Sequence, residues 1–512
     1  MRIRAVTLTT VALLLTAWSA TAAYPPATEA QRTVSRICRQ DPLNNSLAGV
    51  FALRMDGDTV AAVNIRQKLV PASNVKLLTT GLALHLLGPD YRFETRLACS
   101  GEIVDGVLKG DLYILGGGEP TTGARTDCAD PLTTTFARWA QVLADAGISR
   151  IEGRVLGDPR FFSESTPQNL GWTYDDLGTN YGAGPLGLNF FENAQNFYVT
   201  PAASVGAPPT VRPRYPDTPW MRYSVSATTG AARSSNTLYY VNTGFGPFGE
   251  VAGSFPVDRR GYTLECSNLF GAFTCAYYFH NYLKEKGISV QGGYGDVSSR
   301  GEIRTDLVFG GTRDRAPGWD QLRVLGSARS AALADIVRDT NGESDNFYAE
   351  TLLRMISRQS GRGTGPDDCS DAALEAFRAL GLRTDGACQQ FDGSGLSRKN
   401  YVSPEFFVRF LKRMTTLPVW DAYFASLPVP GVKGTLETRF PDAEQEFKDR
   451  IHMKTGSMNG VRCLSGYILA ADGDPAHTIV FSLLVNNCTA PGRVATDAID
   501  AIILAIAAEN GN

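Results

Sequence analysis

The side chains in this sequence best suited to act together chemically are a serine and a lysine three residues apart. Ser73 and Lys76 stand in the stretch of residues 71–76, Pro-Ala-Ser-Asn-Val-Lys, where a helix is expected to begin. Residues i and i+3 share one face of a helix, so the hydroxyl and the amine point into the same space. A serine hydroxyl is a poor nucleophile without an adjacent base. We therefore interpret Ser73 as a nucleophile and Lys76 as its base.

The residues that follow predict a buried helix. Residues 77–87 are apolar almost all the way round, and the run stops at Gly88-Pro89. A lysine at the mouth of such a helix loses hydration, which disfavours its charged form and lowers its pKa. An ordinary serine at a helix N-terminus, followed by a lysine that reaches solvent, produces the same short motif. The pair therefore needs support from elsewhere in the chain.

Two further motifs supply that support. Ser344-Asp345-Asn346 and Lys454-Thr455-Gly456 follow in that order. The same three motifs characterise class A β-lactamases and penicillin-binding proteins. Ser-x-Asn also occurs at residues 234–236 and 457–459. We choose Ser344 because it lies between the other two motifs, on a short connection between two helical patterns, and loops held by rigid elements often carry catalytic groups.

Composition describes an exported globular protein without a nucleic-acid partner. The chain has 512 residues, 43% hydrophobic and 20% charged, with a net charge of −3, which gives no global attraction to nucleic acid or anionic lipid. Residues 1–23 have a basic start, an apolar run too short to span a bilayer and small residues at the end, the pattern of a signal peptide. No later segment predicts a membrane span. We expect a soluble mature protein in the periplasm or cell envelope.

Nine cysteines are consistent with an oxidising compartment. Their clustering suggests four local disulfides, with Cys38 left over. The expected pairs are Cys99 with Cys128, Cys266 with Cys275, Cys369 with Cys388, and Cys463 with Cys488. No Cys-x-x-Cys or His-Glu-x-x-His spacing occurs, so we expect neither a metal nor a cofactor.

Patterning predicts that the two ends of the chain build one α/β domain. Residues 46–64 and 461–486 each read as a β-hairpin, and isoleucines after residue 498 form the stripe of a helix packed on a sheet. Lys454-Thr455-Gly456 is expected to begin the last hairpin. The middle of the chain is rich in Gly, Pro, Tyr and Asn with short alternating runs.

The expected domain organisation is discontinuous. A catalytic domain takes residues 24–92 and 305–512, and an inserted module takes residues 93–304. Within that module we expect a mainly β subdomain at about residues 160–262.

The sequence resembles the class C low-molecular-mass penicillin-binding proteins, the serine D-alanyl-D-alanine carboxypeptidase/endopeptidase family. Besides the three motifs, matching stretches include residues 111–118, 181–183, 392–397 and 430–436. The resemblance implies an α/β (α+β) sandwich of the β-lactamase/transpeptidase type that carries a large, mainly β insertion. It implies peptidoglycan stem peptides as substrates and β-lactam antibiotics as covalent inhibitors. Glu119 departs from the family, which usually has an aspartate after the glycines.

The resemblance also assigns roles. Ser73 attacks the carbonyl while Lys76 takes its proton, and the N–H groups of Ser73 and Ser457 form the oxyanion hole. Ser344 passes a proton to the leaving amine, and Asn346 orients Lys76 and the substrate amide. The remaining contacts to substrate are assigned to Lys454, Thr455 and Gly456, with Asp176 or Asp175 reaching the amine of the third stem residue. A solvated acidic turn is the alternative for the two aspartates.

Three other functions are alternatives. A serine β-lactamase uses the same central residues, but no Glu-x-x-Leu-Asn stretch of the class A enzymes is present. A catalytically silent periplasmic peptidoglycan-binding protein would not need the intact set of polar motif side chains. A Ser-His-Asp hydrolase lacks its Gly-x-Ser-x-Gly motif, and the chain has only four histidines.

Overall fold

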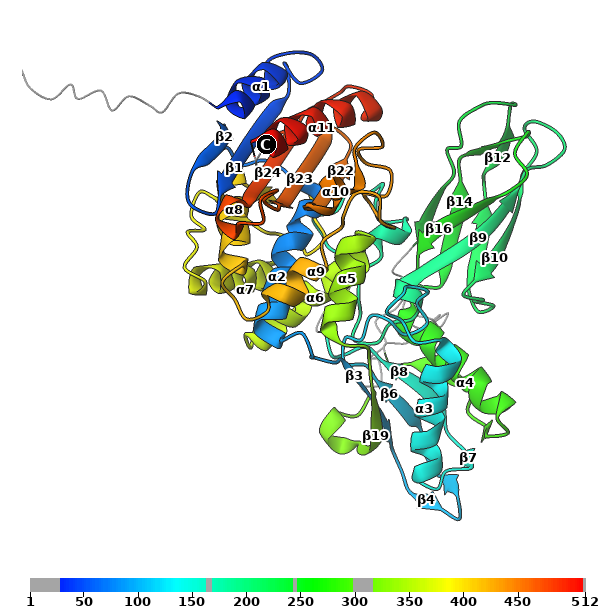
Figure 1. Cartoon of the computed structure of the whole chain (residues 1–512). Coiled ribbons are helices and arrows are strands. Elements are labelled where there is room, and N and C mark those ends of the chain that lie inside the picture. The colour runs from blue at the N-terminus through cyan, green and yellow to red at the C-terminus, as the bar shows by residue number, and fades with distance from the viewer. Residues whose placement is uncertain (1–27, 163–167, 243–245, 298–315, 510–512) are drawn as a thin grey trace, which may run out of the picture.

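The computed structural model describes residues 28–162, 168–242, 246–297 and 316–509. The expected signal peptide lies outside these ranges. Figure 1 shows an α/β domain that contains both ends of the described chain, and two further lobes built from the middle of the sequence. Within the described ranges, no helix is both long and apolar enough to cross a bilayer.

The α/β domain is organised around a five-stranded antiparallel sheet with the strand order β2-β1-β24-β23-β22. β1 near the N-terminus pairs along its full length with β24 near the C-terminus, so the sheet joins segments far apart in sequence, as the two hairpin patterns predicted. The strands are β1 (Leu47–Arg54), β2 (Thr59–Val63), β22 (Ile451–Met458), β23 (Val461–Ile468) and β24 (Ile479–Asn486). The predicted hairpin of residues 461–486 is present as β23 and β24, but Lys454-Thr455-Gly456 does not begin it, because these residues lie in the middle of a further strand, β22, which pairs with β23.

Helices cover both faces of this sheet. Helices α1 (Glu29–Cys38) and α11 (Gly492–Ala508) pack on one face, where Ile502 and Ile503 are fully buried. On the other face the buried helix α2 (Val75–Leu87) lies among several others, as Figure 1 shows. These are α5 (Leu333–Gly342), α6 (Asn346–Gln359), α7 (Pro366–Ala379), α8 (Pro404–Met414) and α9 (Trp420–Ala425). The short α10 (Gln445–Asp449) lies beside β22, and its Phe447 packs with the core of the α11 face.

The first lobe of the middle segment is a mixed α/β unit. Its five-stranded sheet has the order β18-β8-β6-β3-β19, and a smaller sheet has the order β17-β7-β5-β4. The large sheet contains β3 (Glu94–Cys99), β6 (Leu112–Leu115), β8 (Val155–Asp158), β18 (Tyr294–Asp296) and β19 (Arg323–Arg329). The small sheet contains β4 (Ile103–Val104), β5 (Val107–Leu108), β7 (Arg150–Ile151) and β17 (Ser289–Val290), and helices α3 (Leu132–Asp145) and α4 (Gly271–Glu285) complete the unit.

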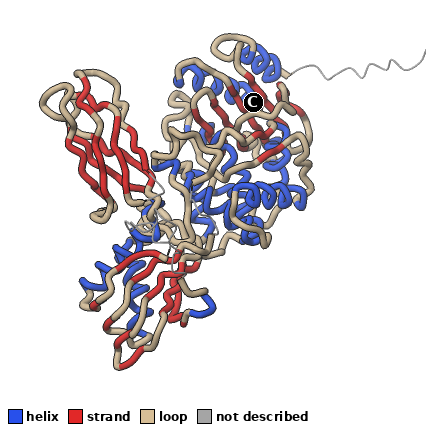
Figure 2. The backbone as a smooth tube through the Cα atoms, turned by 180° about the vertical axis from the view of Figure 1, so that it is seen from behind, coloured by secondary structure: helices blue, strands red, loops and turns tan. Residues whose placement is uncertain are grey.

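The second lobe contains strands without long helices, as the red tube in Figure 2 shows. Its strands are β9 (Ala194–Thr200), β10 (Thr210–Tyr215), β11 (Arg222–Val225), β12 (Thr228–Gly230), β13 (Tyr239–Asn242), β14 (Phe248–Ala252), β15 (Ser254–Pro256) and β16 (Tyr262–Ser267). The domain boundaries stay a prediction. Because β19 pairs with β3, we propose that the second part of the catalytic domain begins near residue 330 and not at residue 305.

The expected disulfides are wrong. The thiols of Cys99, Cys128, Cys266, Cys275, Cys388, Cys463 and Cys488 are free, and so is that of Cys38. Three of the four expected pairs are divided between different cores. Cys463 packs on the α2 face of the catalytic sheet, for example, whereas Cys488 packs on the α11 face. Closeness in sequence did not reveal this, because neighbouring positions on strands and loops can face opposite sides of a sheet.

A thiol count tests this correction. Alkylation of the denatured, unreduced protein should modify all nine cysteines, since no disulfide protects any of the expected pairs. Intact-mass spectrometry with and without prior reduction gives the number directly. A mass increase corresponding to fewer alkylated cysteines without the reductant than with it would show that disulfides form.

Candidate functional site

Ser73 lies in the tight turn that leads into α2. The turn is a 3₁₀ helix, η1 (Ala72–Asn74), and Ala72 has a left-handed φ of 47°. The Nδ2 of Asn74 donates a hydrogen bond of 2.7 Å to Ser465 Oγ on β23, which ties the turn to the sheet. A non-glycine residue with positive φ is uncommon and is often found at functional sites, where surrounding structure holds it.

Lys76 is a fully buried amine with three oxygen neighbours. Its Nζ lies 3.0 Å from Ser73 Oγ, 2.6 Å from Asn346 Oδ1 and 2.8 Å from the carbonyl oxygen of Ser394. The structure thus brings together the first two motifs, as the sequence predicted. It adds the Ser394 carbonyl, which the sequence analysis did not identify.

The electrostatic environment of Lys76 combines two opposing influences. Burial lowers its pKa from 10.5 to about 8, because the charged ammonium has left water. The nearby carboxylates of Asp345, Asp392 and Glu350 act in the opposite direction. Burial is the cause that dominates at Lys76, as the sequence predicted. At slightly alkaline pH a substantial fraction of this amine is therefore uncharged, and a smaller fraction is uncharged at neutral pH.

The third motif faces the second. Lys454 is fully buried in β22, and its Nζ donates to Ser344 Oγ at 2.9 Å and to the carbonyl oxygen of Thr455 at 3.0 Å. Burial lowers the pKa of Lys454 well below its ordinary value, and repulsion from the Lys76 ammonium lowers it further. Ser344 has a left-handed φ of 62°, in the connection between α5 and α6. The three motifs therefore converge on one place.

Two glycines allow segments around Ser73 to approach closely. A Cβ on Gly456 would lie 2.6 Å from the carbonyl oxygen of Pro71, so β22 can lie against the Ser73 turn only without a side chain there. Gly395 has a φ of +86°, and its Cβ would lie 1.9 Å from the carbonyl oxygen of Ala72. Both contacts exclude any other residue type.

The loop that presents the Ser394 carbonyl is held by buried acids. Glu350 on α6 accepts hydrogen bonds from the backbone N–H groups of Gly393 at 3.0 Å and Ser394 at 2.8 Å. Asp392 accepts from the N–H groups of Gly395 and Ser397. Burial raises the pKa of Glu350 to about 7. The only sequence signal for this support was the run of residues 392–397, which we had quoted as a match without a role.

The inserted module contacts the site through hydrogen bonds to Asn346 and to the loop of residues 391–397. The backbone carbonyl of Tyr181 accepts from Asn346 Nδ2 at 2.9 Å, which fixes the amide so that its oxygen faces Lys76. The indole N–H of Trp172 donates to Asp392 at 3.0 Å. The module therefore helps to orient the motif residues.

The two aspartates after Trp172 lie in an exposed turn. The Asp176 carboxylate accepts from the hydroxyl of Thr173 at 2.5 Å, within its own turn, and is half-buried. Asp175 is exposed, and a hydrogen bond with Thr173 lowers its pKa. A contact of either aspartate with substrate stays a prediction.

The remaining predicted site residues lie on β22. Thr455 is half-buried, Gly456 is buried and Ser457 is exposed at the end of the strand. In the part of the chain that the structure describes, no group of three or more His, Cys, Asp or Glu side chains is arranged to hold a metal ion.

The fold and the converging motifs define a serine acyl-enzyme of the penicillin-recognising type. Residues 30–508 match the D-Ala-D-Ala carboxypeptidase 3 (S13) family, and the chain belongs to that family. It is 29% identical over 507 residues to a D-alanyl-D-alanine carboxypeptidase of Actinomadura sp. strain R39, an alignment that covers 95% of this chain and 86% of the relative. It is 22% identical to D-alanyl-D-alanine carboxypeptidase DacB of Haemophilus influenzae, with 89% of this chain and 88% of the relative covered.

A solved structure shares the fold. The crystal structure of penicillin binding protein 4 from Haemophilus influenzae superposes with a TM-score of 0.75 at 22% identity, covering 92% of this chain and 98% of that one. The expected fold class, an α/β sandwich with a large insertion, is confirmed.

The carboxylates around Lys76 lead to a pH prediction. Glu350→Gln keeps an oxygen that can accept from Gly393 and Ser394 but removes a charge that raises the pKa of Lys76. The pKa of Lys76 should therefore fall, and the rise of the acylation rate with pH should move by a few tenths of a unit to lower pH. The measurement is the rate of labelling by fluorescent penicillin from pH 6 to pH 10. Glu343→Gln, which removes an exposed carboxylate, is the control, and a shift to higher pH would contradict the account.

The close approach at Gly456 gives a packing prediction. Gly456→Ala should force β22 away from the Ser73 turn, with a loss of stability of about 1–3 kcal/mol, as for other overpacked sites, and a large loss of acylation. Thermal unfolding and penicillin labelling measure the two effects. Gly342→Ala is the matched control, because a Cβ there meets nothing within 4 Å. Normal labelling of Gly456→Ala would contradict the proposed contact.

Proposed function

We propose that this protein is a serine D-alanyl-D-alanine carboxypeptidase that hydrolyses the D-Ala-D-Ala end of peptidoglycan stem peptides through an acyl-enzyme. The observation that carries the proposal is the set of oxygens around Lys76. Membership of the S13 family and the names of the relatives support the choice of substrate.

The geometry favours one orientation of the neutral amine. A neutral lysine has two N–H groups and one lone pair. The Asn346 and Ser394 oxygens can only accept hydrogen bonds, so they take the two N–H groups. Ser73 is the only one of the three partners that can donate, so the lone pair is left to face its hydroxyl proton. The amine is thereby poised to take this proton as Ser73 attacks the carbonyl carbon.

The other motif residues would serve the leaving group and the carboxylate. The Ser344 hydroxyl accepts a hydrogen bond from Lys454, so its own proton is free to be given to the leaving amine. Lys454 and Thr455 would hold the terminal carboxylate of the substrate, while the N–H groups of Ser73 and Ser457 would stabilise the oxyanion. Loss of one such donor typically costs about 3 kcal/mol of barrier. Water would then hydrolyse the acyl-enzyme.

Related reactions at the same site belong to the proposal. Cleavage of a cross-link needs only a leaving amine that belongs to a neighbouring stem, so DD-endopeptidase activity uses the same residues. A β-lactam would acylate Ser73 and remain, because its leaving group stays tethered. We further propose that the mature protein acts in the periplasm or cell envelope, where these substrates occur.

Release of D-alanine tests the proposal. Purified protein should release D-alanine from a pentapeptide ending in D-Ala-D-Ala and should form a lasting adduct with fluorescent penicillin. Ser73→Ala should abolish both, because it removes the attacking oxygen, whereas Ser234→Ala, in a Ser-x-Asn sequence outside the site, should leave both unchanged. Rapid turnover of nitrocefin without a lasting adduct would identify a β-lactamase instead, and absence of both reactions would indicate a silent binding protein.

A further inference from the structure

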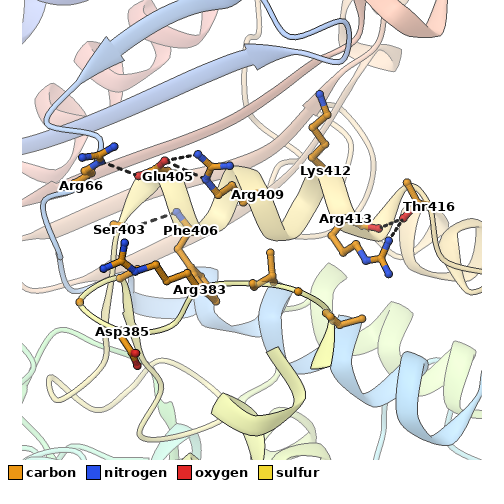
Figure 3. A pocket seen from close by; sticks show the side chains of 15 residues that line it. Arg66, Arg383, Asp385, Ser403, Glu405, Phe406, Arg409, Lys412, Arg413 and Thr416 are labelled. Atoms are coloured by element: carbon orange, nitrogen blue, oxygen red, sulfur yellow. Dashed lines mark hydrogen bonds and ion pairs between the residues drawn. The ribbon is translucent and has the colours of Figure 1, made fainter. Parts of the chain in front are cut away.

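A hollow lies on the catalytic domain, formed by α8, the connection from α7 to β20 (Cys388–Gln389) and the loop after β2 (Figure 3). It has a volume of about 750 Å³. We name it the cationic groove after the cations that line it, which are Arg66, Arg383, Arg409, Lys412 and Arg413. None of the three motifs contributes to it. In Figure 1, α7 and α8 lie on the side of the domain away from the two inserted lobes.

Positive charge exceeds negative charge in this groove. Only two carboxylates, those of Asp385 and Glu405, lie among its five cations, although the whole chain has a net charge of −3. The Glu405 carboxylate forms ion pairs with two of the arginines, Arg66 at 3.2 Å and Arg409 at 2.6 Å. Asp385 pairs at 3.4 Å with Arg378, which does not line the groove. Five cations are therefore balanced by little more than one carboxylate.

Several donors in the groove remain available. Arg383 makes no hydrogen bond or ion pair within the residues that the structure describes, and it is exposed. Arg413 donates to the Thr416 hydroxyl and faces no acid. The Lys412 ammonium donates to the carbonyl oxygen of Met55 and points away from Arg383, as Figure 3 shows. Lys412 and Arg413 lie in the last turn of α8, where the helix dipole favours positive charge, and this alone explains why these two positions are basic. The helix dipole does not account for Arg66 and Arg383, because these two arginines lie on loops that border the same hollow.

The inner surface of the groove is apolar. It includes Leu380, Leu382, Ala387 and Phe406, and the ring of Phe406 is buried. A site with an apolar inner surface and arginines at its rim fits a ligand that has aliphatic groups and carboxylates, because the guanidinium fork matches a carboxylate. The volume falls within the range of about 300–1,000 Å³ that is usual for small-ligand sites.

We propose that the cationic groove binds a carboxylate-bearing stem peptide of peptidoglycan as a second site, separate from the catalytic one. The proposal rests on the proposed function, because that function makes peptidoglycan the polymer the enzyme meets. Stem peptides combine alanine methyl groups with several carboxylates. An anionic bilayer fits less well, because a flat surface cannot enter the hollow, whereas a peptide can. Binding at this groove holds the enzyme on the polymer while Ser73 acts on another stem.

Binding to the polymer with the catalytic site blocked tests this proposal. The protein is first acylated with penicillin, so that Ser73 cannot retain a stem peptide, and is then sedimented with isolated peptidoglycan sacculi at low and high salt. Wild type should pellet and should be released by salt. The double variant Arg383→Glu/Arg413→Glu should bind about tenfold more weakly, because rim charges control association and its dependence on salt. Arg36→Glu/Arg493→Glu, which changes exposed arginines elsewhere on the same domain, should bind as wild type does.

Each possible result of this experiment either supports or overturns the proposal that the cationic groove binds a stem peptide. Equal binding by the groove variant and wild type, or no sedimentation of wild type, overturns the proposal. Binding to phosphatidylglycerol vesicles but not to sacculi also overturns it and assigns the groove to a membrane. Thermal unfolding and penicillin labelling show whether each variant is folded. If the double variant does not fold, the single variant Arg383→Gln is used in its place. Groove-dependent binding by a protein that releases no D-alanine would refute the proposed function while leaving the groove proposal intact.

Discussion

The site depends on keeping one amine in the protein interior with only oxygen neighbours. Lys76 is fully buried, and burial alone would make its charged form costly. Two carbonyl oxygens and one hydroxyl surround its nitrogen, and three carboxylates lie nearby. The result is a lysine whose pKa lies at about 8, close enough to neutrality to exist in both forms. A base is most effective when its pKa lies near the working pH.

The rest of the architecture holds those oxygens in place. The Asn346 amide is fixed by the Tyr181 carbonyl from the inserted module, and the Ser394 carbonyl is fixed by Glu350 on α6. β22 presents Lys454 to Ser344, and Gly456 lets this strand lie against the turn of Ser73. Segments from both ends of the chain and from its middle therefore meet around Ser73 and Lys76.

The sequence revealed those parts that leave a local pattern. The spacing of Ser73 and Lys76, the apolar helix after them and the two alternating hairpins all follow from the periodicity of helices and strands, and the structure contains each of them. Partners that act through the backbone were not visible, because a carbonyl such as that of Ser394 carries no side-chain signature. The acids that hold the loop were missed because nothing in their local sequence shows that α6 packs against it. The disulfide pairs were wrong because separation along the chain does not report which core a side chain enters.

The central claim is the lowered pKa of Lys76, and an NMR titration tests it most directly. Lysines labelled with ¹³C at Cε would be followed from pH 6 to pH 12, and the resonance of Lys76 assigned as the one absent from Lys76→Met. The account predicts a midpoint near pH 8. A midpoint near 10.5, the ordinary value for a solvated lysine, would show that Lys76 remains charged at neutral pH and does not serve as the base for Ser73.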